Sequence, residues 1–282
     1  MKRYLISGAV LLLLLASCGG NKTSGNEEAK PDSVKADTVM TDSVAETVAE
    51  AVIEETPMPK AADELFDDFI FNFAASKKLQ MERILFPLPT INGMEKKNIA
   101  KGEWKIDHFF MRQGYYTLLF DDETEMEVVK DTQICHAVVE KIYFNTESVI
   151  QYYFDRPQGA WVLTSIHTIP ISQSTNATFL QFYHQFAKDK EFQAESLGET
   201  VEFVGPDPDD DFNQMEGIIT RDTWEAFAPE LPTKMIYNII YGQPKKEGNS
   251  KLFVLRGIAN GQELEMSFRC KKGKWQLVKL TT

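Results

Sequence analysis

Aspartate, histidine and tyrosine side chains within one short stretch could do acid–base chemistry. Asp107 and His108 are adjacent, and Tyr116 lies shortly after them. Such side chains act as general acids and bases when a pocket brings them together, so these three are the candidates for a pocket. The remaining histidines are His136, His167 and His184. No two histidines have the spacing of a helical zinc motif, and the sequence has no glycine-rich phosphate loop. We therefore expect no metal, no cofactor and no catalytic activity.

An acidic stretch offers a second type of chemistry, calcium binding. Its oxygen-bearing residues alternate as in a calcium loop and are Asp207, Asp209, Asp211 and Asn213. However, Phe212 stands where such a loop needs glycine, and Ile218 where it needs glutamate. Two prolines, at positions 206 and 208, instead favour an exposed, solvated loop. We expect that loop rather than a calcium site.

The charge balance argues against a nucleic-acid partner. The chain has 30 Lys and Arg residues against 42 Asp and Glu residues, which gives a formal net charge of -12. A protein that binds nucleic acid needs a positive surface to displace counterions. The sequence contains no basic stripe that would supply one.

The N-terminus has the features of an export signal. Lys2 and Arg3 precede an apolar run over residues 4–16, which is shorter than the roughly 20 residues of a membrane-spanning helix. The residues Leu15-Ala16-Ser17-Cys18 resemble the bacterial lipobox. This resemblance implies a lipoprotein signal peptide at 1–17 and a mature chain that begins with Cys18.

In such lipoproteins the cysteine carries acyl chains such as palmitate, which hold the protein on a membrane without spanning it. Gly19 stands where an aspartate would retain some lipoproteins at the inner membrane, so the outer membrane is favoured. The sequence leaves open whether the protein faces the periplasm or the outside.

Residues 18–62 have the composition of a flexible tether. Leu, Phe, Trp and Tyr are absent from this acidic stretch, so it cannot bury enough apolar surface to fold, and we expect disorder. An Asp-(Ser/Thr)-aliphatic triplet occurs three times in it, at Ser33, Thr38 and Ser43. The triplet resembles an O-glycosylation acceptor of some Gram-negative anaerobes. The alternative is drift in a low-complexity segment.

The rest of the chain contains an internal repeat. Phe66, Phe69 and Phe73 recur 113 residues later as three more phenylalanines, and in both places the spacing predicts one apolar helix face. Asp63 and either Thr175 or Asn176 are the candidate helix caps. Further pairs follow in the same order, and they include Trp104 with Trp224, residues 115–120 with 235–240, and Trp161 with Trp275. We infer a duplicated unit, with copies at 63–172 and 173–282.

Each copy begins with helices and ends with strands. In the second copy, strands are expected at 234–241, 251–257, 263–270 and 274–280, with a tight turn at Asn260-Gly261. In the first, strands are expected at 133–144, 148–154 and 160–169. The fold class is therefore α+β, with two tandem units whose N-terminal helices pack on a curved antiparallel sheet. Cys135 and Cys270 are expected to be buried free thiols, with a disulfide between them as the alternative.

A helix-first unit that closes on a curved sheet resembles the nuclear-transport-factor-2-like cone within the cystatin-like group. The whole chain, with its lipobox, acidic linker and two units, is similar to a family of bacterial lipoproteins that carry a domain of unknown function. That resemblance implies no established activity.

We therefore expect a lipid-anchored envelope protein that binds a small ligand or a partner protein without catalysis. The alternatives are an enzyme with a single active-site cone and a structural or assembly factor of the envelope.

Overall fold

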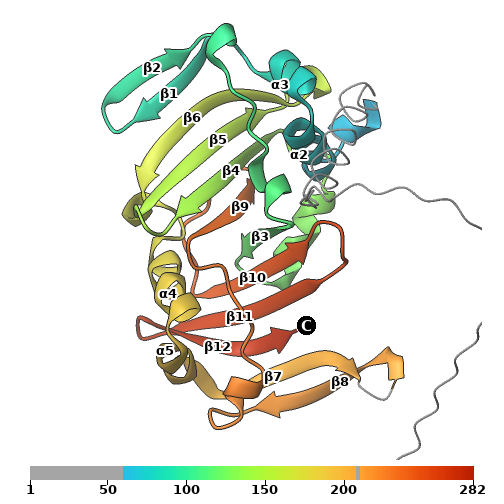
Figure 1. The fold of residues 1–282 in the computed structure, drawn as a ribbon, viewed down its shortest axis with the longest axis vertical. Helices are drawn as coiled ribbons and strands as arrows, with labels where there is room; N and C mark the ends of the chain where they lie inside the picture. The colour runs from blue at the N-terminus through green and yellow to red at the C-terminus, as the bar shows by residue number, and fades with distance from the viewer. Residues whose placement is uncertain (1–59, 208–209) are drawn as a thin grey trace, which may run out of the picture. The chain divides into compact units, whose positions relative to one another are not determined.

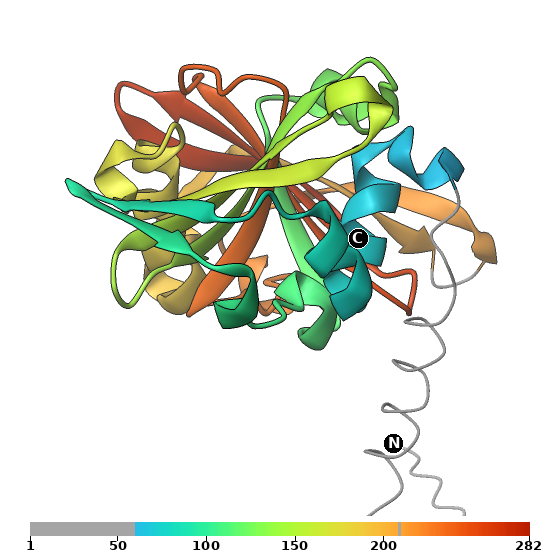
Figure 2. The ribbon, with the colours of Figure 1, turned by 90° about the horizontal axis from the view of Figure 1, so that it is seen from above.

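The computed structural model describes residues 60–207 and 210–282, which form two six-stranded sheets and four α-helices (Figures 1 and 2). The mixed α+β class expected from the sequence is confirmed. The signal peptide, Cys18 and the triplets at Ser33, Thr38 and Ser43 lie outside the described residues. Within the described part of the chain, no helix has both the length and the apolar character needed to cross a membrane.

The first sheet has the strand order β2-β1-β6-β5-β4-β9. Its strands are β1 (Leu88–Asn92), β2 (Glu95–Ile99), β4 (His136–Tyr143), β5 (Ser148–Asp155), β6 (Val162–Pro170) and β9 (Met235–Tyr241). All neighbours are antiparallel except β1 and β6, which pair in parallel.

The second sheet has the order β3-β10-β11-β12-β7-β8. Its strands are β3 (Tyr115–Phe120), β7 (Leu197–Asp207), β8 (Asp210–Ile219), β10 (Ser250–Gly257), β11 (Glu263–Lys271) and β12 (Lys274–Thr281). Here β7 and β12 are the parallel pair. The expectation of wholly antiparallel sheets is therefore wrong at one pair in each sheet, where a long connection rather than a hairpin joins the neighbours.

The two sheets have the same order when equivalent strands are matched, but their end strands are exchanged. Strand β9 belongs to the second half of the chain and pairs with β4 of the first, whereas β3 belongs to the first half and pairs with β10 of the second. The strand expected at 234–241 therefore exists, but its expected place in the second sheet is wrong. Alternating apolar residues predict a strand and its buried face, but they do not determine which other strand it pairs with. The unit boundaries at 63–172 and 173–282 stay a prediction.

The helices come in two matching pairs, α2 (Phe66–Ala75) with α3 (Lys77–Arg83), and α4 (Ala177–Lys188) with α5 (Lys190–Glu195). Each pair is interrupted where a polar side chain caps the second helix. Ser76 Oγ accepts a hydrogen bond from Leu79 N at 3.2 Å, and Asp189 Oδ1 accepts one from Phe192 N at 3.0 Å. These caps are 113 residues apart, as the repeat requires.

The aromatic faces of α2 and α4 pack on their sheets in the same way. Phe66 meets the Trp161 ring edge-on at 4.8 Å between centroids, and Phe179 meets Trp275 at 5.3 Å. Trp161, Trp224 and Trp275 are buried, and Trp104 is half-buried. The periodicity that predicted an apolar helix face is thus confirmed in both halves, and it builds two aromatic cores.

Two local expectations need correction. The acidic stretch around 207–213 is not simply a loop, because β7 runs up to Asp207 and β8 begins at Asp210, so the two strands form a hairpin.

The cysteines are free, as expected, but Cys135 is exposed and Cys270 half-buried. Cys135 precedes the first residue of β4 and lies outside the core.

The exchanged strands meet through side chains rather than through a ladder. Thr117 Oγ1 accepts a hydrogen bond from Tyr237 N at 3.0 Å and donates one to the Tyr237 carbonyl oxygen. The amide of Asn238 accepts from Leu119 N at 2.9 Å and donates to the Glu140 carboxylate at 2.9 Å. Glu140 is fully buried, and burial raises the pKa of its carboxyl. These contacts join the two sheets.

We expect Asn238→Leu to lower the free energy of unfolding by about 2–4 kcal/mol, because Leu119 N–H and the Glu140 carboxylate each lose a buried partner. Urea unfolding followed by tryptophan fluorescence measures the loss. Adding Glu140→Val should recover part of it, since Leu118 and Val254 form the equivalent pair in the second sheet. An unchanged urea midpoint for Asn238→Leu would show that these bonds do not stabilise the junction.

Candidate functional site

Asp107, one of the three residues singled out in the sequence, is held in a network of hydrogen bonds. Its carboxylate accepts from Lys141 Nζ at 2.6 Å through both oxygens, from Tyr152 Oη at 2.8 Å and from Phe109 N at 2.9 Å. The Asp107 backbone bonds in turn to the buried Gln80 side chain. A carboxylate with this many donors is fully satisfied, so the network ties the loop before β3 to the first sheet.

Lys141 completes this network from strand β4. Its side chain is only 10% exposed, and its ammonium lies 5.0 Å from the Phe109 ring centroid and 5.3 Å from that of Tyr152. Burial, followed by the charge of Asp107, raises the pKa of Tyr152 far above its usual range. The strand pairing places Leu255 of the second sheet at the position equivalent to Lys141. The charged network therefore occurs in one half only.

The other two candidates do not join Asp107 in a pocket. The ring of His108 is half-buried, and no hydrogen bond from it occurs among the described residues. Tyr116 is buried against the Phe110 ring, with centroids 5.3 Å apart. Burial raises the pKa of its hydroxyl, and the Arg256 guanidinium opposes this shift by a smaller amount. The interpretation of these three residues as one pocket is therefore not supported by their positions.

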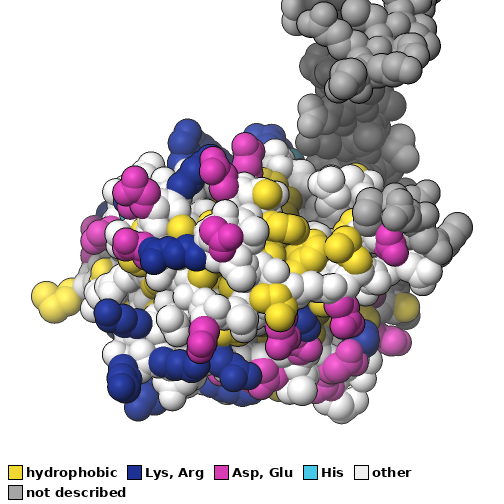
Figure 3. Space-filling view, turned by 90° about the horizontal axis from the view of Figure 1, so that it is seen from below, with side chains coloured by type: hydrophobic (Ala, Val, Ile, Leu, Met, Phe, Trp, Pro, Cys, Tyr) yellow, Lys and Arg dark blue, Asp and Glu magenta, His cyan; other side chains and the backbone are white. Residues whose placement is uncertain are grey.

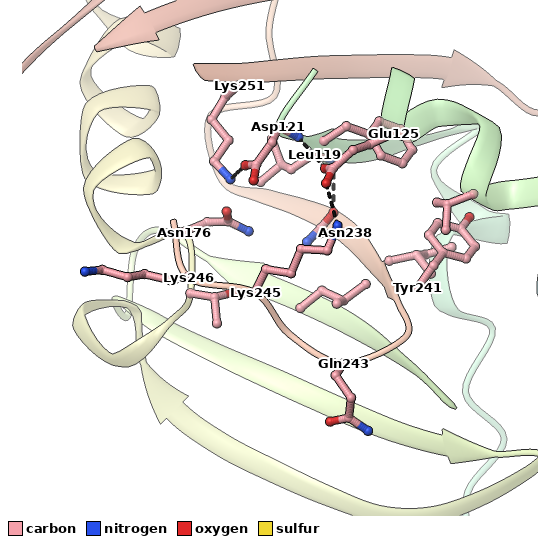
Figure 4. Close-up of a pocket in the computed structure, with 15 residues that line it drawn as sticks. Leu119, Asp121, Glu125, Asn176, Asn238, Tyr241, Gln243, Lys245, Lys246 and Lys251 are labelled. Atoms are coloured by element: carbon pink, nitrogen blue, oxygen red, sulfur yellow. Dashed lines mark hydrogen bonds and ion pairs between the residues drawn. The ribbon is translucent and has the colours of Figure 1, made fainter. Parts of the chain in front are cut away.

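A cleft lies instead where the exchanged strands β3 and β9 end (Figure 4). Its volume is about 240 Å³. The described residues that line it belong to the end of β3 and the following 3₁₀ helix η4 (Glu123–Lys130), to the end of β9, to the loop after β9, to the start of β10 and to the residues just before α4. The cleft thus draws on both halves of the chain.

Four of the five charged side chains that line the cleft form two ion pairs. Lys251 Nζ forms an ion pair with Asp121, and Lys245 Nζ lies 2.7 Å from Glu125 Oε1. Glu125 also accepts a hydrogen bond from Asp121 N at 2.9 Å. Figure 4 shows these pairs on one wall, with Lys246 directed away. The interior therefore offers little unpaired charge to a ligand.

Among the described residues that line the cleft, Asn176 has a side-chain amide without a hydrogen bond to the rest of the described chain. The residue is 6% exposed, and Figure 4 shows its amide directed into the cleft. Within residues 60–207 and 210–282, its side-chain amide has no hydrogen-bond partner. The amide therefore reaches the solvent of the cleft and is available to a ligand.

The free amide of Asn176 follows from how helix α4 begins. Asn176 occupies the N-cap position that the sequence predicted, but its side chain makes no capping bond. Glu247, from the loop after β9, caps the helix instead, since its carboxylate accepts from Thr178 N at 3.1 Å and Phe179 N at 2.9 Å. The other predicted cap, Asp63, binds Arg83 and Trp161 N. Sequence reasoning had no signal that a distant glutamate would take over the cap.

A second, wider groove lies over the outer face of the second sheet. Its volume is about 650 Å³, and it is lined by polar and charged side chains of β7 and β10–β12. Lys279 in this groove is paired with Glu123 at 2.7 Å. The smaller cleft is the better candidate site, because residues of both halves of the chain line it and the Asn176 amide faces it without a bond to the described residues.

The surface also carries exposed apolar side chains. Figure 3 shows a face where apolar side chains gather between basic and acidic ones. The large apolar side chains exposed on the described part of the chain are Leu85, Met94, Met215, Ile218 and Phe227. Nothing in the described residues indicates what would cover them, and we assign no site to this face.

We expect Asp107→Ala to lower the free energy of unfolding by about 2–4 kcal/mol, because it leaves the Lys141 ammonium buried without a counterion. The double variant Asp107→Ala/Lys141→Leu should recover at least half, since Leu255 occupies the equivalent position in the second sheet. His108→Ala is the control and should stay within about 0.5 kcal/mol of the parent. Urea unfolding measures all three, and equal losses in the single and double variants would refute a buried ion pair.

Comparisons with known proteins agree with this fold. A family described as a domain of unknown function, DUF4348, matches residues 45–282. The crystal structure of an NTF2-like protein from Bacteroides fragilis is 41% identical, covers 80% of this chain and 98% of its own, and superposes with a TM-score of 0.71. No curated protein matches the chain significantly. The chain therefore belongs to the DUF4348 family and has an NTF2-like fold.

Proposed function

We propose that this protein is a non-catalytic binding protein of the bacterial cell envelope, and that the cleft between β3 and β9 holds a small ligand or a segment of a partner protein. The observation that carries the proposal is the Asn176 side-chain amide, which faces the cleft and has no hydrogen-bond partner in the described part of the chain. A ligand in the cleft can therefore bond to this amide without displacing a protein group.

The lining of the cleft supports binding over catalysis. No histidine or cysteine occurs among the described residues that line it, and the Asp121 and Glu125 carboxylates are each engaged by a lysine. The runner-up, an enzyme with one active cone, would use the network in the first half. Asp107 and Lys141 would then have to release each other before either could transfer a proton, which their mutual contacts oppose.

The N-terminal sequence supports the envelope location. The lipobox before Cys18 would give an acylated N-terminus, and residues 18–62 would tether two duplicated units, 63–172 and 173–282, to the outer membrane. Glycans on Ser33, Thr38 and Ser43 would stiffen this tether and shield it from proteases.

We expect Asn176→Leu to weaken ligand binding at least tenfold, because it removes the amide that faces the cleft without a partner among the described residues. Native mass spectrometry of protein extracted from its own membrane should show a bound mass that this variant lacks. Asn98→Leu, at an exposed position of β2, is the control and should keep the bound mass. A parent protein without any bound mass, or a variant that retains it, would contradict the binding function.

We expect Cys18→Ser to abolish acylation, because the thiol is the acceptor of the lipid. After growth with labelled palmitate, the parent protein should carry label and sediment with membranes, while the variant should carry none and remain in the soluble fraction. Cys135→Ser is the matched control and should behave as the parent. A labelled Cys18→Ser protein would refute the anchor.

A further inference from the structure

We propose that the occupant of the cleft is an extended peptide segment, which pairs with the open edge of β9 at Ile239 and Tyr241 as an added strand. This inference rests on the proposed binding function of the cleft and names the chemistry of its ligand. It depends on three features, namely where the cleft touches β9, which backbone groups are open there, and the neutral character of the walls.

The cleft touches the edge of β9 rather than one of its faces. Consecutive residues of this strand line it, from Asn238 to Tyr241, and so do the consecutive residues 119–121 at the end of β3. Successive side chains of a strand point to opposite faces. A cavity that contacts consecutive residues must therefore lie beside the backbone.

The hydrogen bonds at both ends of β9 fix which backbone groups face the cleft. Phe144 N bonds to the Lys234 carbonyl at 3.0 Å, and Gly242 N bonds to the His136 carbonyl at 2.8 Å. The backbone N–H and carbonyl groups of the even-numbered residues of this segment therefore bond to β4. The same groups of the odd-numbered residues point away from β4. Tyr237 follows the rule, because its N–H bonds to Thr117 Oγ1.

Ile239 and Tyr241 come next on the outward-pointing side. Strand β9 is the end strand of its sheet and pairs with β4 alone, so the backbone N–H and carbonyl groups of Ile239 and Tyr241 point away from the strand that β9 pairs with. Ile239 is 2% exposed, so its backbone groups are shielded from bulk water. Unpaired backbone groups at a buried strand edge are a template for another strand.

The facing edge of β3 does not compete for the same occupant. Leu119 N is bonded to the Asn238 side chain, and Asp121 N is bonded to Glu125. The N–H groups at this end of β3 are thus already bonded to side chains. An incoming strand therefore finds fewer free donors on β3 than on β9.

The walls suit a neutral main chain better than an ion. The lining carboxylates and the lysines that pair with them neutralise each other, whereas Asn176 offers both a donor and an acceptor, as a peptide group does. Leu119 and Val128 add apolar surface for small side chains. The volume of about 240 Å³ is below the roughly 300–1,000 Å³ of common small-molecule sites, so only a short stretch of a longer peptide would lie inside.

The test uses a pool of hexapeptides with acetylated N-termini, amidated C-termini and only uncharged residues. The full-length protein is immobilised, retained peptides are identified by mass spectrometry, and their affinities are measured by calorimetry. Each retained peptide is then made again with every backbone amide N-methylated, which keeps the side chains but removes the donors. We expect this change to weaken binding at least tenfold. Asn176→Leu should weaken the unmodified peptides by a similar factor, and Asn98→Leu should not.

Each outcome decides a different question. Equal affinity of the methylated and unmodified peptides would overturn strand pairing. If no peptide is retained but the membrane-extracted protein carries a non-peptide mass that Asn176→Leu lacks, the peptide inference fails and the binding function stands. If neither a peptide nor a bound mass is found, both fail.

Discussion

The contact between Thr117 and Tyr237 is the interaction on which the rest of this structure depends. It joins the outer edges of two sheets that share no ladder, and the Asn238 amide reinforces it beside the buried Glu140. Because β3 and β9 have each crossed to the opposite sheet, this junction is also where each half completes the other. The cleft lies where the two strands end.

The two halves of the chain share their framework and differ at several buried positions. The helix breaks at Ser76 and Asp189 and the aromatic pairs of Phe66 and Phe179 recur. In contrast, Lys141 has an apolar counterpart, and Glu140 pairs with Asn238 where the second sheet pairs two apolar residues. Buried charged and amide groups carry a desolvation cost unless they are bonded. At these two positions, therefore, the first sheet carries buried polar contacts that the second sheet lacks.

The sequence predicted the elements well because their signals are local. The spacing of Phe66, Phe69 and Phe73 is sufficient for an amphipathic helix, and the pairs of tryptophans located the second copy. The exchange of strands could not be predicted in this way, since the residues of β9 would suit either sheet equally. The hairpin β7–β8 was missed because the prolines and aspartates near its turn have the composition of a loop.

The site was harder to predict than the fold, for a physical reason. Asp107 was a candidate because it is a charged residue beside a histidine. In the structure its carboxylate is paired with Lys141 and accepts a hydrogen bond from Tyr152. Asn176 received attention only as a helix cap. Its availability depends on Glu247, which is far away in sequence and reaches the same helix end through the fold. A group that is left without a partner can be recognised only after every possible partner has been placed.

The exchange of end strands also governs how this chain can fold as it emerges from the ribosome. Strand β4 cannot pair with β9 until residue 241 has been synthesised. Strand β3 cannot pair until β10, which lies still further along the chain, has been synthesised. Contacts this distant in sequence slow folding and expose strand edges in the meantime. A nascent chain of this protein therefore has to remain protected through most of its synthesis, because neither half can become a finished domain ahead of the other.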